Sequence, residues 1–314
     1  MRTLLQVAAL GLVSLVGFQG QTGGRPSWAF LAPDKEQPAV AERNGEIHIP
    51  GSKKAYTEKQ IDDLTNPPDW VPEEHGQVPK VVAGAPGSTG LACGSCHLMT
   101  GQGHPESADL AGLPVEYLVR QMMDFKNGTR IDAARMNTIA KVTSEEDVRR
   151  AAEWFAALKP AAWVRVMESQ TVPKSYVSTK GRMRLPLPDG GTEPLGDRII
   201  ELPQDPSRAT SRDPHSGFVA YVPPGSLEKG KRLVTTGGAG KTINCTICHG
   251  DDLKGLGDVP RIAGLHPIYI VRQLYGFKGN EYTGTSAALM KKVVAGLNED
   301  DMISIAAYAA SVAP

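Results

Sequence analysis

Apolar residues recur at helical spacing in two matching stretches of the chain, and each stretch predicts a helix. In the first, one face is formed by Val148, Ala151, Ala152, Phe155 and Leu158. Residues three and four apart lie on one side of an α-helix, so this face should pack on a core. Ser144 precedes the acidic residues 145–147 as an N-cap, and Pro160 ends the helix. In the second stretch, Asn298 caps a helix that begins with the acidic residues 299–301.

A middle helix precedes the first of these capped helices. Pro114 stands at a first-turn position, and Gly128 marks the end. One face of this helix carries Val115, Leu118, Val119, Met122 and Phe125. A chain of short amphipathic helices joined by irregular loops is therefore expected.

These helices belong to an internal repeat. Residues 111–130 (AGLPVEYLVRQMMDFKNGTR) and 263–282 (AGLHPIYIVRQLYGFKGNEY) share nine of twenty residues at an offset of 152. Farther on the offset becomes 154, which implies a two-residue insertion in the second copy. A repeat of this length in two copies predicts a duplicated domain rather than a solenoid.

The repeat predicts domain boundaries along the 314 residues. The expected parts are an N-terminal extension at 30–78, a first domain at 79–159, an inter-domain segment at 160–224 and a second domain at 225–314. The inter-domain segment contains ten prolines and is expected to be irregular, apart from short strands at 182–187 and 198–202 around a turn at 188–191.

The start of the two copies differs. Residues 226–234 predict a helix before the second copy, whereas residues 79–90 before the first are rich in Gly and Pro. The N-terminal helix of the first domain should therefore be short, displaced or absent, with residues 41–78 as its substitute.

All four cysteines lie in two Cys-x-x-Cys-His motifs. The first comprises Cys93, Cys96 and His97, and the second comprises Cys245, Cys248 and His249. This pattern predicts two covalently bound haem c groups, because each thiol can bond one haem vinyl group and the His can bind the iron. Thioredoxin-like redox pairs and one zinc held by both pairs are the alternatives. Neither alternative explains the His after each second Cys.

A second axial ligand would decide between electron transfer and catalysis. Met136 lies 39 residues after His97, and Met290 lies 41 residues after His249, so they align once the insertion is counted. A soft thioether suits haem iron and raises its reduction potential. Met122 is interpreted as core packing. The remaining histidines do not repeat and are interpreted as surface residues: His48, His75, His104, His215 and His266.

The first 29 residues predict a secretory signal. Arg2 precedes an apolar run from Leu4 to Phe18, which is too short to span a membrane comfortably, and residues 27–29 offer a small-x-Ala cleavage site. A periplasmic location is expected, and the alternative is an uncleaved N-terminal anchor or peripheral membrane association. The formal net charge is zero and no basic tract occurs, which excludes a nucleic-acid-binding class.

With these motifs the chain resembles the two-domain, di-haem class I cytochromes c of the bacterial c-four type. The shared pattern is Cys-x-x-Cys-His, Leu/Ile-Ala-Gly, Tyr-Leu/Ile-x-x-Gln-x-x-x-Phe-Lys, a Met and a capped helix, over 91–159 and 225–313. The resemblance implies a mainly α fold of two tandem class I cytochrome c domains, each a few helices around one covalent haem. It also implies a periplasmic carrier of single electrons with His/Met haems, whose redox partners are a dehydrogenase or a terminal oxidase.

The resemblance also indicates where this chain departs from the family. A Pro carbonyl usually orients the axial His; Pro260 fits this role in the second domain, and Ala108 stands at the first. The repeated Arg120 and Arg272 indicate either pairing with haem propionates or a solvated helix face. The segment 160–224 is interpreted as a structural cover over the haem crevice.

Two other functions remain open from the sequence. The long segment 160–224 and the unusual N-terminus suit a haem-bearing subunit of a larger dehydrogenase or oxidase complex. A di-haem peroxidase is disfavoured, because such an enzyme needs an open iron position and here each domain offers its own Met. No catalytic residue is predicted.

Overall fold

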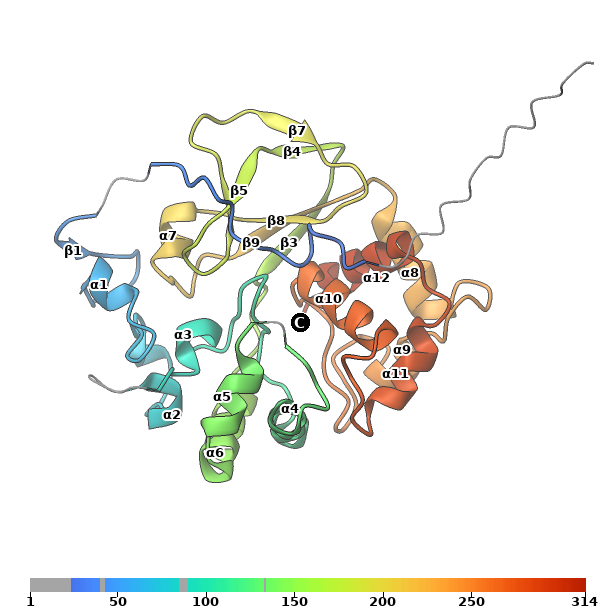
Figure 1. The fold of residues 1–314 in the computed structure, drawn as a ribbon, viewed down its shortest axis with the longest axis horizontal. Coiled ribbons are helices and arrows are strands. Elements are labelled where there is room, and N and C mark those ends of the chain that lie inside the picture. The colour runs from blue at the N-terminus through green and yellow to red at the C-terminus, as the bar shows by residue number, and fades with distance from the viewer. Residues whose placement is uncertain (1–23, 40–42, 85–89, 133) are drawn as a thin grey trace, which may run out of the picture.

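The computed structural model describes residues 24–39, 43–84, 90–132 and 134–314 (Figure 1). Two helical bodies lie side by side, and a layer of short strands lies over both. The predicted ranges divide the chain into the N-terminal extension (30–78), the first domain (79–159), the insert (160–224) and the second domain (225–314). Most of the predicted signal segment lies outside the described residues.

The second domain is a helical bundle with a continuous apolar core. Its helices are α8 (Ser226–Thr236), α9 (Thr246–His249), α10 (Pro267–Lys278), α11 (Ala287–Val294) and α12 (Glu299–Ser311). Helix α12 packs against α8 and α10, and most of its residues are buried. The predicted cap is confirmed, because Asn298 and Asp301 form a reciprocal capping box at its start.

The first domain repeats this bundle with a smaller first helix. It contains α2 (Lys80–Ala83), α3 (Gly94–His97), α4 (Val115–Asn127), α5 (Met136–Val142) and α6 (Glu145–Ala157). Ser144 caps α6 as predicted, by accepting a hydrogen bond from the backbone N–H of Asp147. The four-residue α2 contacts α6 where the eleven-residue α8 contacts α12. The expectation of a short N-terminal helix in the first domain is thus confirmed.

The repeated Ala-Gly of each domain has a backbone reason. Gly112 and Gly264 both have positive φ, at +71° and +68°, and their N–H groups donate to carbonyls near the end of α6 and α12. A Cβ on Gly112 would lie 2.8 Å from Pro160, and a Cβ on Gly264 would lie 2.9 Å from Pro314. Each of these two positions therefore requires glycine for two reasons: its positive φ, and the close approach of the proline that follows α6 or α12.

Equivalent segments of the two domains pair with each other. Ile131 N donates to Glu281 O at 2.9 Å, and Thr283 N donates to Thr129 O at 2.7 Å. At the offset of 152, Ile131 corresponds to Thr283 and Thr129 to Glu281, so the two bonds are counterparts. The domains therefore meet about an approximate two-fold axis, as subunits do in an isologous dimer.

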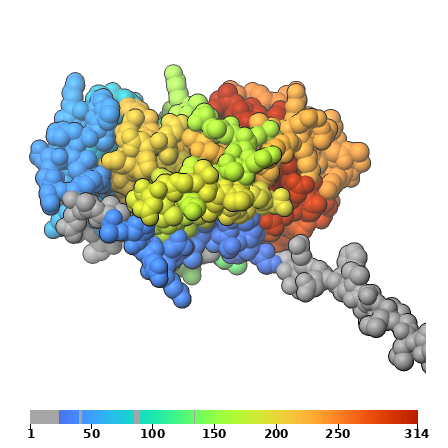
Figure 2. Space-filling model, turned by 90° about the horizontal axis from the view of Figure 1, so that it is seen from above, coloured from blue at the N-terminus to red at the C-terminus, as the bar shows by residue number. Residues whose placement is uncertain are grey.

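The insert forms a small β structure. Residues 160–224 are all described and contain seven short strands and one helix: β3 (Val164–Glu168), β4 (Thr171–Pro173), β5 (Ser175–Val177), β6 (Arg184–Pro186), β7 (Thr192–Pro194), β8 (Ile200–Pro203), α7 (Pro206–Thr210) and β9 (Phe218–Val222). Strand β9 lies between β3, to which it is parallel, and the antiparallel β8. Figure 2 shows the insert across the middle of the molecule, between the N-terminal extension and the second domain.

The predicted strands of the insert exist, but they do not pair with each other across the predicted turn. Strand β6 pairs with β5, and β8 pairs with β9. The turn at 188–191 is present, with Gly190 N donating to Leu187 O, and it leads from β6 to β7. A local pattern predicts an extended segment, whereas its partner is set by which apolar side chains become buried together.

The N-terminal extension packs on the insert and also on the first domain, where Leu64 O accepts from Ala92 N and His75 lies against Trp154. It contains β1 (Glu46–Ile47), β2 (Tyr56–Thr57), α1 (Glu58–Ile61) and the 3₁₀ turn η1 (Pro72–Glu74) around a small core with Ile61 and Trp70. Trp70 Nε1 donates to Ser211 O, and Arg212 Nε donates to Ile61 O. These contacts connect the extension to α7 of the insert.

Residues 25–30 pack on the second domain, and this bears on the predicted cleavage site. Trp28 and Ala29 are buried in the core of that domain, and Trp28 Nε1 donates to Glu299 Oε1 at 2.9 Å. Arg25 forms an ion pair with Glu281 and lies over the ring of Phe30. A signal boundary at residue 29 would remove this buried tryptophan from the core of the second domain. Within the described ranges, no helix is long and apolar enough to cross a membrane.

Candidate haem sites

A cavity of about 710 Å³ lies beside α3, α4 and α5 of the first domain, and residues of the extension, the insert and the second domain complete its lining. Cys93, Cys96, His97 and Met136 all line it. Apolar side chains of the bundle line it as well, among them Leu118, Phe125 and Phe155. The structure therefore brings the four predicted haem ligands of the first domain to one largely apolar cavity.

His97 is held in the form that can bind a metal. Its Nδ1 lies 2.7 Å from the carbonyl oxygen of Ala108. A carbonyl can only accept, so Nδ1 carries the proton and Nε2 keeps a free lone pair. Burial lowers the pKa of His97, which favours the neutral imidazole that coordinates iron. The Ala108 carbonyl therefore orients His97 although no proline stands at this position.

His249 of the second domain repeats this arrangement. Its Nδ1 lies 2.8 Å from Pro260 O, and burial lowers its pKa as well. Met290 lies on α11, is half-buried and packs against the same apolar core as Cys245. Met136 instead is the first residue of α5. The two Met residues thus occupy equivalent places in the chain but different positions within their helices.

The cysteines do not have the character of a redox pair or a zinc site. Burial raises the pKa of the Cys93 thiol to about 12 and that of Cys245 to about 11. A redox-active Cys-x-x-Cys needs the opposite shift, because the thiolate is the nucleophile. In the part of the chain that the structure describes, no three His, Cys, Asp or Glu residues are grouped to hold a metal ion. Both alternatives to haem attachment thus lack support.

A buried arginine gives the cavity a site for an acidic group. Arg130 donates to Gln121 in its own domain and to Gln273 Oε1 of the second domain at 2.7 Å. Its Nε is buried and has no hydrogen-bond partner among the described residues, although Arg130 lines the cavity. An uncompensated buried cation is costly, so this nitrogen calls for an anionic partner. An apolar cavity with a free guanidinium nitrogen fits a porphyrin that carries carboxylates.

The repeated arginines of the middle helices connect the two domains. Arg272 of α10 contacts Glu106 of the first domain, with an Nη1–Oε2 distance of 2.7 Å. Arg120 of α4 contacts Asp258 of the second domain, with an Nη1–Oδ2 distance of 3.9 Å. Glu106 and Asp258 are themselves equivalent at the offset of 152. Arg272 does not lie on a solvated helix face, whereas Arg120 is 34% exposed as the helix-face interpretation expects. Each arginine forms the counterpart of the other's inter-domain pair.

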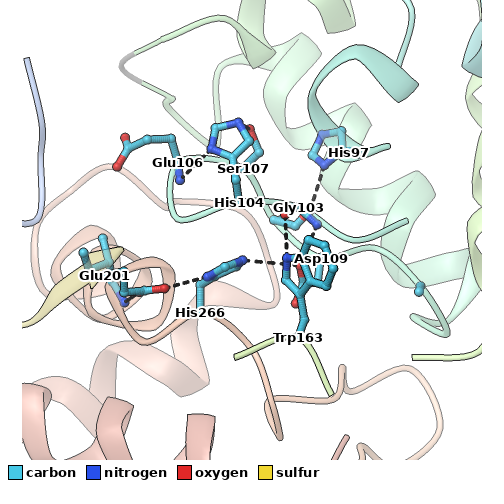
Figure 3. A network of polar contacts seen from close by, with 12 residues as sticks. His97, Gly103, His104, Glu106, Ser107, Asp109, Trp163, Glu201 and His266 are labelled. Atoms are coloured by element: carbon cyan, nitrogen blue, oxygen red, sulfur yellow. Dashed lines mark hydrogen bonds and ion pairs between the residues drawn. The ribbon is translucent and has the colours of Figure 1, made fainter. Parts of the chain in front are cut away.

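His266 was wrongly interpreted as a surface residue. Its side chain is 1% exposed, and its Nδ1 lies 2.6 Å from Glu201 Oε2 of β8 (Figure 3). The other carboxylate oxygen of Glu201 accepts from Ile268 N at 2.7 Å. Neither residue repeats, so the sequence carries no signal for the pair. The pair of His266 and Glu201 is a buried, charged contact between β8 of the insert and the start of α10.

The network around His266 extends toward the first haem cavity. Figure 3 shows His266 between Glu201 and Asp109, and Asp109 Oδ1 accepts from Gly103 N at 2.6 Å. Trp163 of the insert donates to Gly103 O at 3.0 Å. Glu106 and His104 follow in the same turn and line the cavity. The insert is therefore joined to the loop that carries the Ala108 carbonyl.

Comparisons with known proteins relate the chain to cytochromes. No family model matches it. Cytochrome c-554(547) of Halothiobacillus neapolitanus is 35% identical over 85 residues, which are 24% of this chain and 93% of that protein. The chain belongs to the c-type cytochromes. Two longer matches, each at 25% identity, are cytochrome c4 of Stutzerimonas stutzeri (69% of this chain, 82% of that protein) and the thiosulfate dehydrogenase electron acceptor of Thiomonas intermedia (70% and 78%).

The family assignment agrees with the fold and the motifs. This cytochrome has two class I cytochrome c domains and two covalently bound haem c groups, one for each Cys-x-x-Cys-His motif. It is an electron carrier rather than an enzyme. The insert and the N-terminal extension are additions around that two-domain frame.

Proposed function

We propose that this cytochrome carries single electrons between redox proteins of the periplasm through two His/Met haems. One observation supports this most directly: His97 and Met136 line the same cavity, with the His97 Nε2 lone pair left free by the bond to Ala108. Two axial protein ligands fill the coordination sphere of the iron, which favours electron transfer over binding of a substrate.

Each predicted site residue has a distinct role in holding a haem. Cys93 and Cys96 bind the first haem covalently, with His97 and Met136 as axial ligands. The second haem is bound by Cys245 and Cys248, with axial ligands His249 and Met290. A bound haem supplies one-electron chemistry by changing between its ferric and ferrous forms. The chain itself orients each His through a carbonyl, excludes water and places Arg130 toward a carboxylate.

The two domains are further proposed to have arisen by tandem duplication, with boundaries at 79–159 and 225–314. Support comes from the counterpart bonds at the inter-domain axis and from the paired Gly112 and Gly264. Export is proposed through a signal segment that ends before Arg25. The packing of Trp28 in the second domain supports this boundary.

Optical spectroscopy of the oxidised holoprotein tests the ligands. We expect the weak long-wavelength sulfur–iron band and little binding of added cyanide. Met136→Ala and Met290→Ala should each remove about half of that band, because each haem contributes one Met ligand. Met122→Ala is the matched control, since Met122 also lines the cavity and is assigned to packing. High-spin iron in the wild type, or a full band in either ligand variant, would overturn the assignment.

A dehydrogenase is proposed as the electron donor. The relative from Thiomonas intermedia is itself named as an electron acceptor of thiosulfate dehydrogenase, and it matches 70% of this chain. The test is stopped-flow reduction of the oxidised cytochrome by a thiosulfate dehydrogenase and thiosulfate, with the dehydrogenase omitted as control. Rapid reduction supports this donor. A stable stoichiometric complex on gel filtration would favour the role of a haem-bearing subunit, and no reduction would exclude a thiosulfate dehydrogenase as the donor.

A further inference from the structure

The two inter-domain ion pairs join equivalent residues of the repeat, but one pair is largely exposed to solvent and the other is largely buried. Arg120 and Asp258 have side chains that are 34% and 64% exposed, whereas those of Arg272 and Glu106 are 14% and 10% exposed. The two pairs are equivalent in the repeat, so the difference comes from what surrounds them. The insert covers the side of the axis where Glu106 lies, through the contacts of Trp163 with Gly103.

Glu106 lies where its charge can influence the first haem site. It lines the same cavity as His97 and Met136. Its Oε2 accepts from Arg272, while its Oε1 is buried without a hydrogen-bond partner in the described part of the chain. A carboxylate that is only half satisfied in a buried site is poorly stabilised in its charged form.

Charged groups of both signs face Glu106 and have opposing effects on its protonation. Arg272 of α10 is the direct cation, and Arg182 and Arg184 of the insert add weaker attraction. Glu201 of β8 opposes them with a second negative charge. His104 lies in the same turn, with Glu106 N 3.3 Å from its Nδ1, and burial lowers the pKa of His104 to about 3. His104 is therefore neutral and does not supply a charge.

We propose that Glu106 takes up one proton when the first haem site receives an electron, and that Asp258 does not do so at the second site. This inference rests on the proposed haem site of His97 and Met136. A redox partner supplies the electron, which lowers the positive charge of the iron centre by one. The Glu106 carboxylate then binds one proton from solvent and becomes a carboxylic acid, and reoxidation releases that proton.

The protonation equilibrium of Glu106 suits this role. Burial, opposed by Arg272, raises the pKa of Glu106 to about 7, so both forms exist near neutral pH. Removing a nearby positive charge raises the pKa of a carboxyl further. Reduction thus increases the protonated fraction in this pH range, and linkage requires the reduction potential to fall as the pH rises.

Redox titrations of the two haems at a series of pH values test the inference. In the wild type, one haem should become harder to reduce as the pH rises through about 7, with a reduction equilibrium that changes at most about tenfold per pH unit. Glu106→Gln should remove this dependence, because Gln keeps the acceptor for Arg272 but cannot bind the proton. Asp258→Asn, the equivalent change at the exposed pair, should leave it intact.

A second measurement needs no variant. The reduced-minus-oxidised infrared spectrum of the wild type near pH 7 should gain the band of a protonated carboxylic acid. Potentials that do not depend on pH, or a dependence that survives Glu106→Gln, would overturn the inference. In those cases the sulfur–iron band would still be present, whereas failure of the proposed haem site would show as its absence. The two proposals can thus fail separately.

Discussion

Arg130 and Tyr282 occupy equivalent positions in the two repeats, and in the folded chain they pair with each other. They form an isolated antiparallel bridge, and the Arg130 guanidinium lies over the Tyr282 ring at 5.1 Å. Tyr282 OH donates to Gln273 Oε1, which also accepts from Arg130. Two equivalent positions of the repeat therefore contact each other across the domain axis. One domain supplies a cation and the other supplies an aromatic ring.

Arg130 should be the main polar contributor to the domain interface. Arg130→Met keeps the apolar stem but removes the bonds to Gln121 and Gln273, so we expect a loss of about 3 kcal/mol in the free energy of unfolding. Urea unfolding of the holoprotein measures this loss. Arg150→Met is the control, because its exposed pair with Glu146 should contribute at most about 0.5 kcal/mol. Equal effects of the two changes would show that the interface does not depend on Arg130.

The buried pair of His266 and Glu201 should make stability depend on pH. Burial alone would lower the pKa of His266, but the Glu201 carboxylate at 2.6 Å outweighs it and raises that pKa above the ordinary 6.5. The folded state then binds the His266 proton more tightly than the unfolded state. The stabilisation is complete below pH 6.5 and is lost as the pH rises through the folded pKa.

Glu201→Gln tests this dependence. The variant should be less stable by about 3 kcal/mol near pH 6, because one partner of a buried pair is removed. Its difference from the wild type should shrink at alkaline pH, where His266 of the wild type is neutral. Chemical unfolding at several pH values measures both effects. A difference that stays constant between pH 6 and 9 would contradict a charged pair.

The mature protein should retain Trp28. Intact-mass analysis of the exported protein is expected to place its first residue at or before Arg25, because Trp28 and Ala29 are buried. In the same protein, Trp28→Ala should cost about 3–5 kcal/mol through the cavity that it leaves. Trp28→Phe retains most of the packing and loses the bond to Glu299, so it should cost less. A mature chain that begins at residue 30 would refute this boundary.

Gly112 should tolerate no side chain. Gly112→Ala combines a left-handed backbone at φ +71° with a Cβ 2.8 Å from Pro160, and we expect a loss of about 2–4 kcal/mol. Gly190 is the matched control, because its φ is +68° but none of the described atoms would lie within 4 Å of its Cβ. Gly190→Ala should therefore cost only about 1 kcal/mol. Thermal or urea unfolding compares the two, and equal losses would mean that the contact with Pro160 is unimportant.

The sequence by itself determined the local features. The capped helices after Ser144 and Asn298 form where their patterns predict them, because caps and apolar spacing act within a few residues. The pairing of His97 with Ala108 O also follows from a short segment of chain. The same holds for the shortened α2, since the Gly- and Pro-rich residues before Cys93 disfavour a longer helix.

Only the tertiary structure decided how distant segments meet. The two predicted strands of the insert, β6 and β8, pair with β5 and β9 rather than with each other. His266 became buried because β8, which carries Glu201, packs against it. Glu106 and Asp258 are alike in the repeat, yet one is buried and the other exposed. Repeats specify which residues are equivalent, but burial and charge depend on everything that packs around them. The two ion pairs differ because the insert covers one side of the axis between the domains.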